Sequence, residues 1–325
     1  AEAMFLAAQG DRTRPRTDAV IARAQALIVE IDDPELLAWL AAARGLAAYQ
    51  GGQFRRAAEL AEEGSRRLRE DCAAALWEAG GVEALSLWAL FYLGELRTLS
   101  SRVDVAVEHA RLRGNRFDAA NFGSGLPALA WAVADRTAQG RVEVEHAIAE
   151  WSPRGFHLQH YYALLAMASF ELYDGHAAEA HARIEAVWPM LVGSRLLIAQ
   201  SVTIEAQHLR GRAAIATGGD AGRERAALHR LHGNPWADAM GTLLEAGAQL
   251  DRDAAVRMLA IAIEACVRAD LAAFAYAARR RRGELLDGDE GRALVARADR
   301  ELADQAVRAP DKFARLLVPI RAGNP

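Results

Sequence analysis

The chain has 325 residues, of which 52% are hydrophobic and 25% charged, so it has ample material for an ordered core and is not a disordered tail. Its net charge of -4, with both signs interspersed, argues against a nucleic-acid-binding surface, which normally carries a basic excess. Alanine, leucine, arginine and glutamate dominate and β-branched residues are sparse, which predicts an all-α fold. Lys312 is the only lysine, and this excludes mechanisms that need a lysine in the body of the fold.

No segment of the sequence predicts a membrane or export signal. The most apolar stretch, Val82 to Leu93, contains Glu83 and is shorter than the roughly 20 residues that a bilayer-spanning helix needs. The first ten residues lack the basic flank and cleavage site of a signal peptide. The two cysteines, Cys72 and Cys266, are far apart and are expected to be buried thiols. We therefore expect a cytoplasmic protein.

Apolar spacing and helix breakers predict helices along the whole chain, and no strand signal is present. Proline after a capping residue marks two of the starts, at Asp33-Pro34 and Asn234-Pro235. The predicted helices are 1–9, 17–31, 34–50, 53–70, 72–93, 95–113, 116–138, 141–151, 158–173, 176–190, 195–216, 221–232, 235–250, 253–269, 270–286, 289–306 and 310–318.

The spacing of small residues predicts a tetratricopeptide-like (TPR-like) repeat. Gly45 precedes Gly52 by seven residues and Ala57 follows five residues later, which suits one helix packing closely on the next, a turn, and a second close crossing. The pattern recurs, in full or in part, at Ala168, Gly175, Ala180, Gly211 and Gly218. The consensus aromatic residues are out of register, so the units are TPR-like only. We expect one right-handed α-solenoid of antiparallel helix pairs.

The expected repeats divide a single domain, 1–325. Residues 1–33 form a truncated first repeat, because the turn at Gly10 comes too early for a complete first helix. Further repeats occupy 34–310, and 311–325 form a C-terminal helix and tail. A cut repeat leaves an apolar face without its polar cap, so we expect a piece of a longer protein.

Catalytic motifs are missing from the sequence. Neither a phosphate-binding P-loop nor the protein-kinase motifs are present. Gly123-Ser124-Gly125 lacks the full nucleophile motif and is interpreted as a break inside helix 116–138, with Pro127 restarting the helix. His157 and His160 share a helix face but have no further ligands at metal-binding spacing. We predict no catalytic residue, no cofactor and no metal.

Four consecutive arginines, 279–282, are the best candidate for an anion or nucleic-acid patch. Successive helical residues point around the helix, and acidic residues follow at once, so a solvated helix face is the favoured interpretation.

The remaining function is binding through the concave face that TPR-like arrays present. Polar and aromatic residues cluster at the start of helix 158–173, where unpaired N–H groups suit an anionic or carbonyl ligand. In the alternative interpretation, the histidines cap and hydrogen-bond the loop 151–157, and the other candidates are ordinary surface or inter-helix residues. The candidate binding residues are His157, Gln159, His160, Tyr161, Asn121, Asp135 and Gln207.

The segment WSPRGFHLQHYYALLAMASFELYDG, the Trp188-Pro189 pair, LRGRAAIA and YAARRRRGELLDGDEGRALVARAD together resemble the C-terminal TPR region of large bacterial serine/threonine kinases, especially those of myxobacteria. The resemblance covers residues 90 to 318 and implies a sensor or scaffold in a signalling protein. It is also compatible with the helical arm of a STAND-type or LuxR-type regulator. The expected partner is a protein, a peptide, another domain of the parent chain or a small ligand, and neither nucleic acid nor a membrane is expected.

Two other classes of function stay open. An independent all-helical enzyme would need a bound metal or a closed pocket with several acidic residues. A structural spacer would have a bare, alanine-rich concave surface.

Overall fold

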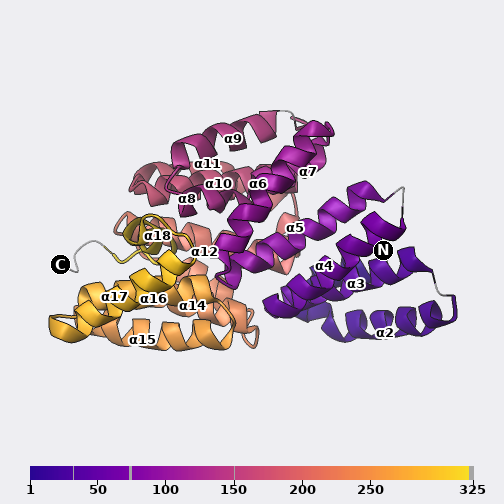
Figure 1. Ribbon diagram of the computed structural model, residues 1–325. Coiled ribbons are helices and arrows are strands. Elements are labelled where there is room, and N and C mark those ends of the chain that lie inside the picture. Colours follow the sequence, from indigo (N-terminus) through magenta and orange to yellow (C-terminus); the bar gives the residue numbers. More distant parts are fainter. Residues whose placement is uncertain (32, 73–74, 150, 322–325) are drawn as a thin grey trace.

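The computed structural model describes residues 1–31, 33–72, 75–149 and 151–321, and this part of the chain contains helices and no strand (Figure 1). The all-α prediction is therefore confirmed. The helices are α1 (Glu2–Ala8), η1 (Gly10–Thr13), α2 (Arg14–Ile31), α3 (Pro34–Gln50), α4 (Phe54–Asp71), α5 (Leu76–Tyr92), α6 (Leu96–Leu112), α7 (Arg116–Gly123), η2 (Pro127–Leu129), α8 (Ala130–Val133), α9 (Thr137–Ala149), α10 (Leu158–Tyr173), α11 (Ala177–Gly193), η3 (Leu196–Ile198), α12 (Gln200–Ala216), α13 (Gly222–His229), α14 (Pro235–Gly247), α15 (Arg252–Arg268), α16 (Ala272–Leu285), α17 (Gly288–Asp304) and α18 (Pro310–Leu317).

Local signals place most helix ends where the sequence predicts them. The side chains of Asp33 and Asn234 accept hydrogen bonds from the first backbone N–H groups of α3 and α14, as their positions before proline suggest. The turn glycines Gly52, Gly175 and Gly218 have φ angles of 72°, 84° and 81°, which glycine adopts without steric cost.

The predicted helix 116–138 is interrupted more extensively than expected. The break at Ser124 and the restart at Pro127 are confirmed, but the restarted helix ends at Val133. Asp135 then takes a positive φ of 54°, a conformation that aspartate tolerates better than most residues, and α9 begins at Thr137. Residues 134–138 are therefore a turn and a new helix start, not the end of one long helix.

The helices form an inner and an outer set. The inner helices α3, α5, α10, α12, α14 and α16 contact one another in the interior, and the outer helices cover them (Figure 1). Almost every residue of α10 is buried, whereas the following outer helix α11 buries only Ala180, Ile184 and Leu191. A helix that is apolar on all sides must be surrounded by others, and an amphipathic helix covers them with one face.

Aromatic rings join the inner helices at the centre of the molecule. The ring of Trp236 lies 5.6 Å from that of Tyr49, 5.3 Å from that of Phe54 and 4.9 Å from that of Tyr92, measured between ring centroids. Each pair is edge-on, the geometry that ring quadrupoles favour. The four rings come from α3, α4, α5 and the distant α14, and they belong to one continuous core.

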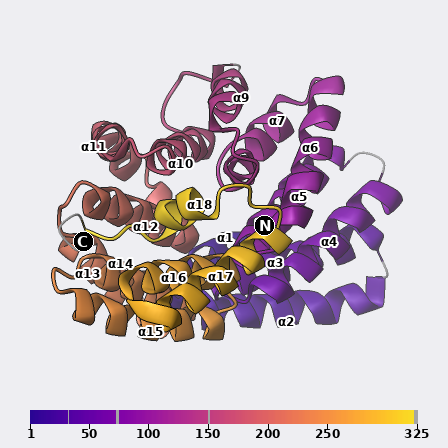
Figure 2. The ribbon, with the colours of Figure 1, turned by 60° about the vertical axis from the view of Figure 1, so that its left-hand side comes forward.

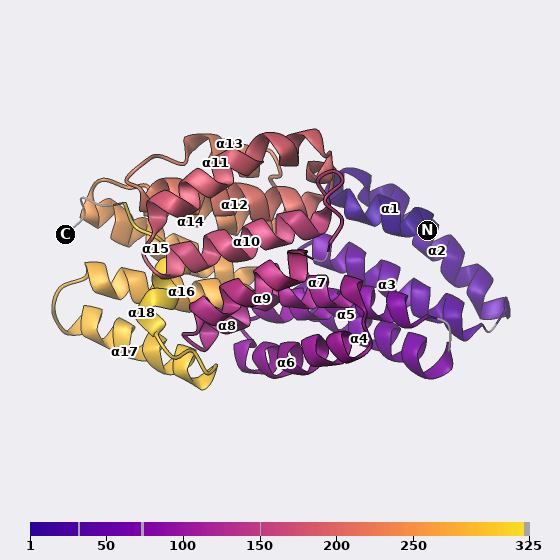
Figure 3. The ribbon, with the colours of Figure 1, turned by 90° about the horizontal axis from the view of Figure 1, so that it is seen from above.

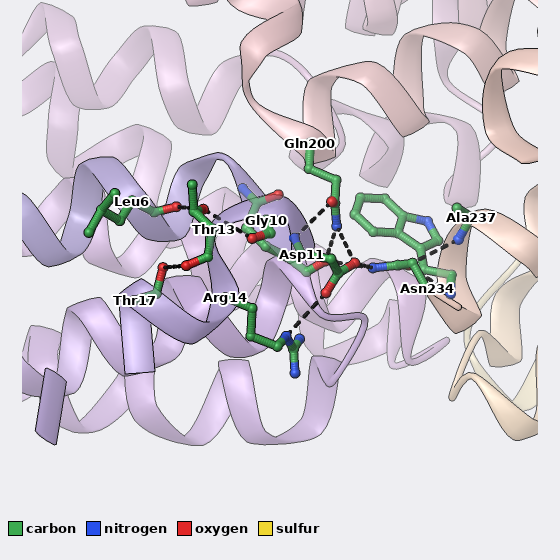
Figure 4. Close-up of polar contacts among 11 residues, drawn as sticks. Leu6, Gly10, Asp11, Thr13, Arg14, Thr17, Gln200, Asn234 and Ala237 are labelled. Atoms are coloured by element: carbon green, nitrogen blue, oxygen red, sulfur yellow. Dashed lines mark hydrogen bonds and ion pairs between the residues drawn. The ribbon is translucent and has the colours of Figure 1, made fainter. Parts of the chain in front are cut away.

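A polar joint also connects segments that are far apart in the sequence (Figure 4). The Asp11 carboxylate accepts hydrogen bonds from Gln200 Nε2 at 3.0 Å and from Asn234 Nδ2 at 2.7 Å. The same two amide groups donate to the backbone carbonyl of Gln50 at 2.8 and 2.9 Å. In an open repeat array each unit contacts only its neighbours, whereas here η1, α3, α12 and α14 meet at one point.

The C-terminal helix α18 packs between α10 and α16 and buries one of its faces there (Figure 2). Phe313, Leu316 and Leu317 are buried, and Arg212 Nη1 donates to the Leu316 carbonyl at 2.8 Å. Residues 322–325 of the predicted tail lie outside the described residues.

The two ends of the helical array lie apart, with α2 at one end of the molecule and α17 at the other (Figure 3). Among the described residues no helix combines the length and the apolar character needed to cross a membrane.

Candidate functional site

The predicted histidine pair caps a helix. His157 is the N-cap residue of α10, and its backbone N–H donates to Nδ1 of His160 at 3.0 Å. Trp151 Nε1 donates to Nδ1 of His157, also at 3.0 Å. The pKa of His160 is lowered from its usual value, first by burial and then by the nearby His157. This geometry favours the alternative in which the histidines cap and hydrogen-bond the loop 151–157.

The other predicted binding residues do not meet at one surface. Gln159 and Asn121 are both buried and hydrogen-bonded to each other at 3.3 Å, while Gln207 is half-buried. Tyr161 is fully buried and belongs to a hydrophobic cluster of the core, so it does not line an open surface. Asp135 lies in the turn before α9, among residues of a different part of the fold.

Asp135 forms an ion pair with Lys312 of α18. We call the group of Asp135, Tyr173 and Lys312 the Asp135 site. The Asp135 carboxylate accepts hydrogen bonds from Lys312 Nζ at 3.0 Å and from the Tyr173 hydroxyl at 2.9 Å. The Lys312 ammonium also lies 5.4 Å from the centroid of the Tyr173 ring, within cation–π range. The pKa of Asp135 is lowered most by the hydrogen bond from Lys312 and next by the hydrogen bond from Tyr173.

A second carboxylate, Glu205 on α12, lies among the inner helices and is half-buried. Its Oε1 accepts hydrogen bonds from the hydroxyls of Tyr49 at 3.0 Å and Tyr92 at 3.1 Å, and its Oε2 accepts a longer one from Tyr161 at 3.5 Å. Three inner helices, α3, α5 and α10, supply these hydroxyls. Among the described residues no arginine, lysine or histidine forms an ion pair with Glu205, and this distinguishes it from Asp135.

The surroundings of Glu205 disfavour its charge. Burial raises its pKa to about 7, although the hydrogen bonds from Tyr49, Tyr92 and Tyr161 act in the opposite direction. The pKa values of the three tyrosines are raised well above the usual range, first by burial and then by Glu205 itself. The tyrosines therefore stay protonated as hydrogen-bond donors, while Glu205 titrates near neutral pH.

A small cavity opens beside this carboxylate, and we call it the Glu205 pocket. Glu205 and Trp88 are only half-buried although they lie among inner helices, so the pocket is in contact with solvent. The rings of Trp88 and Tyr162 are 5.2 Å apart and form one wall. The Glu205 pocket is lined by Tyr49, Trp88, Leu126, Tyr162, Leu165, Ser201, Val202 and Glu205.

The predicted break after α7 helps to build this pocket. Gly125, with a φ of 65°, donates its backbone N–H to the carbonyl of Tyr162 at 3.0 Å. A Cβ atom at this position would come within 3.2 Å of the Tyr162 side chain, so glycine permits the close approach. The approach brings the neighbouring Leu126 into the pocket lining.

Sequence reasoning missed Glu205 but found its surroundings in part. Tyr161 was a candidate because it lies at the start of helix 158–173, not because of Glu205. The spacing of residues 205, 208 and 212 places Glu205, His208 and Arg212 on one face of α12. His208 and Arg212 are both buried. Three ionisable residues on one face of an otherwise buried helix are the signal that could have indicated an interior polar site.

The arginine run 279–282 is neutralised within the chain. Arg279 pairs with Glu301, Arg280 with Asp299, and Arg281 donates to the Val318 carbonyl. The run therefore ties α16 to α17 and to the residue after α18, and this leaves little free positive charge for an anionic partner.

Comparison with models of protein families, with curated proteins and with solved structures found no match for the chain. Among the described residues no group of three or more histidine, cysteine, aspartate or glutamate side chains is placed to hold a metal ion.

Proposed function

We propose that the protein is a non-catalytic binding module whose Glu205 pocket receives a lysine side chain from a peptide segment of a protein partner. The observation that carries the proposal is the pairing of a carboxylate with aromatic rings at Glu205. The Asp135 site also combines a carboxylate with a tyrosine ring, and there the ammonium group of Lys312 from α18 contacts both.

The size of the pocket favours an ammonium group. It has room for about one group the size of a water molecule, which suits an ammonium better than the larger planar guanidinium of arginine. The rings of Trp88 and Tyr162 offer the face on which a cation is attracted, and Glu205 offers the opposite charge.

The chemistry around Glu205 favours binding over catalysis. A single carboxylate titrating near pH 7 could act as a general base, but a reaction also needs a nucleophile or a second acid within reach. The hydroxyls closest to Glu205 belong to tyrosines whose pKa values are raised, so they are poor proton donors to a substrate. They suit the role of holding the carboxylate in place.

We further propose that the chain is a TPR-like superhelix of antiparallel helix pairs and that it acts as a sensor or scaffold in a larger signalling protein. The small residues at the helix crossings support the first part, since a Cβ atom on Gly45 would already touch Leu60 and Ala61 of α4. The resemblance of residues 90 to 318 to the helical region of bacterial serine/threonine kinases is the support for the second part.

The pocket can be tested by selection from a random peptide display library on the wild-type protein, with counterselection on Glu205→Gln. We expect the enriched peptides to contain lysine, and to bind the Glu205→Gln variant at least tenfold more weakly. Exchange of the lysine for arginine should weaken binding as well. Glu185→Gln is a matched control, because Glu185 is a half-buried glutamate on the outer helix α11, and it should leave the affinity unchanged.

Two results would contradict the proposal. One is a set of enriched peptides that bind wild type and Glu205→Gln equally. The other is a set of enriched peptides that contain no lysine. Unaltered circular dichroism of Glu205→Gln would ensure that the comparison is made between folded proteins.

A further inference from the structure

A second cleft, distinct from the Glu205 pocket, lies between α2 and α4 with α3 beneath it. Its volume is about 230 Å³, below the roughly 300–1,000 Å³ typical of small-molecule sites, so it suits a single charged group rather than a whole cofactor. We call it the arginine cleft. Its polar lining consists of Arg14, Thr17, Asp18, Arg44, Gln53 and Arg56.

Arg44 is the unusual residue of the arginine cleft. It belongs to the inner helix α3 and is half-buried, and within the described part of the chain its side chain has neither an ion pair nor a hydrogen bond. A partly desolvated guanidinium with five donors and no acceptor is costly unless something accepts its hydrogen bonds. An oxyanion in the cleft would do so.

The other two arginines of the cleft can be recruited at small cost. Arg14 pairs with Asp11 at 3.1 Å and Arg56 with Glu59 at 3.2 Å, and all four side chains are well exposed. Exposed pairs of this kind contribute only about 0–1 kcal/mol, so a stronger acceptor can compete for the arginines. Arg14 is also positioned by Gly51, since a Cβ atom there would collide with its guanidinium.

The cleft continues over the turn between α3 and α4 into a larger depression of about 680 Å³. Arg14, Gln53 and Arg56 line both hollows, and the larger one adds Arg55 and Arg268. The two hollows are therefore adjacent, and the larger one lies next to the position of a charged group bound at Arg44.

We propose that the arginine cleft binds the phosphate group of a phosphorylated ligand, with Arg44 as its anchor. Guanidinium groups match phosphate oxygens in geometry and remain charged at every physiological pH. Once Arg14 and Arg56 leave Asp11 and Glu59, three arginines of the cleft lining stand against one carboxylate, Asp18, and this excess suits a dianion better than a monoanionic carboxylate. The polar side chains of Thr17 and Gln53 add hydrogen bonding next to the arginines.

Inorganic pyrophosphate is the first probe, and calorimetric titration at low ionic strength is the measurement. We expect saturable binding to the wild-type protein and at least a tenfold loss of affinity in Arg44→Gln. Arg56→Gln changes an exposed residue of the cleft and should weaken binding two- to fivefold without affecting the fold. The control Arg66→Gln, on α4 with its side chain more than half exposed, should bind like the wild type.

Calorimetric titrations with acetate and with sulfate distinguish phosphate recognition from a general attraction of anions. Weaker binding of both supports the proposal, whereas acetate binding as tightly as pyrophosphate would overturn it. The proposal also fails if pyrophosphate does not bind saturably, or if Arg44→Gln and Arg56→Gln, both folded by circular dichroism, retain the wild-type affinity.

Discussion

Two carboxylates that accept hydrogen bonds from tyrosines, the exposed Asp135 and the half-buried Glu205, have opposite electrostatics. Each accepts a hydrogen bond from at least one tyrosine, but only Asp135 is in contact with a cationic side chain, Lys312. Accordingly the pKa of Asp135 is lowered and that of Glu205 is raised to about 7. At Glu205 three hydroxyl donors do not offset the effect of burial on the pKa, whereas at the exposed Asp135 burial has a smaller effect than the hydrogen bonds from Lys312 and Tyr173.

The comparison depends on α18 being held firmly, because it delivers Lys312 to Asp135. Replacement of Phe313 by alanine should lower the free energy of unfolding by about 3–5 kcal/mol, since Phe313 is fully buried between α10 and α16. Urea unfolding followed by circular dichroism measures the change. Leu112→Ala, at a side chain that is 75% exposed, should stay within about 0.5 kcal/mol of wild type. A loss below about 1 kcal/mol in Phe313→Ala would show that α18 is only loosely attached.

The raised pKa of Glu205 predicts a pH dependence of stability. Its pKa in the folded protein, about 7, exceeds the ordinary value of 4.5, so between these values the folded state binds more protons than the unfolded state. The contribution of Glu205 to stability is therefore greatest below pH 4.5 and is lost as the pH rises to 7. Glutamine does not titrate, so the stability of wild type relative to Glu205→Gln should fall by on the order of 1–3 kcal/mol over that interval.

Urea unfolding of both proteins at several pH values measures this difference. Asp118, whose pKa is raised to about 6, contributes a slope of the same sign, but it is present in both proteins and cancels. Parallel stability curves for the two proteins would mean that Glu205 titrates normally.

Removal of one tyrosine hydroxyl tests how much each hydrogen bond stabilises the charged form of Glu205. Tyr92→Phe removes a donor at 3.1 Å that lowers the pKa of Glu205, so this pKa should rise further above 7. The cost in stability should be about 0.5–1.5 kcal/mol, the usual value for one hydrogen bond. Tyr276→Phe, at a half-buried tyrosine outside the group that bonds Glu205, is the control and should leave that pKa unchanged. Carboxyl-carbon NMR of glutamate-labelled protein reports the pKa, and an unchanged value in Tyr92→Phe would contradict the assignment.

The smallest effect is expected at the Asp135 site. Lys312 and Asp135 are 40% and 39% exposed, so solvent screens their attraction. A double-mutant cycle with Lys312→Gln and Asp135→Asn should give a coupling free energy below about 1 kcal/mol that decreases in high salt. A coupling above about 2 kcal/mol would mean that the pair is far less hydrated than its exposure indicates.

Helix positions were largely predictable because their signals are local. Asp33 before Pro34 and Asn234 before Pro235 fix two helix starts by capping bonds within three residues. The contacts between distant segments were not predictable, since the bonds between Asp11 and Gln200 join residues separated by 189 positions. The spacing of apolar residues along the chain does not indicate which distant segments contact each other.

The same reasoning explains why the candidate site was found only in part. The cap residues His157 and His160 stand out in the sequence because they are close together, yet their bonds stay within the loop and helix start. Glu205 is one glutamate in a helix of mixed composition, and it becomes distinctive only where tyrosines from α3, α5 and α10 converge on it.

The most direct test of the central claim is the pKa of Glu205, measured by carboxyl-carbon NMR, in increasing concentrations of n-butylammonium chloride. We expect the pKa to fall saturably from about 7 towards and below 4.5, because the bound ammonium stabilises the carboxylate as Lys312 does at Asp135. Tetramethylammonium chloride at equal ionic strength, which is too large for the pocket, should leave the pKa near 7. A pKa of Glu205 that responds equally to both salts, or to neither, would contradict a lysine-binding pocket.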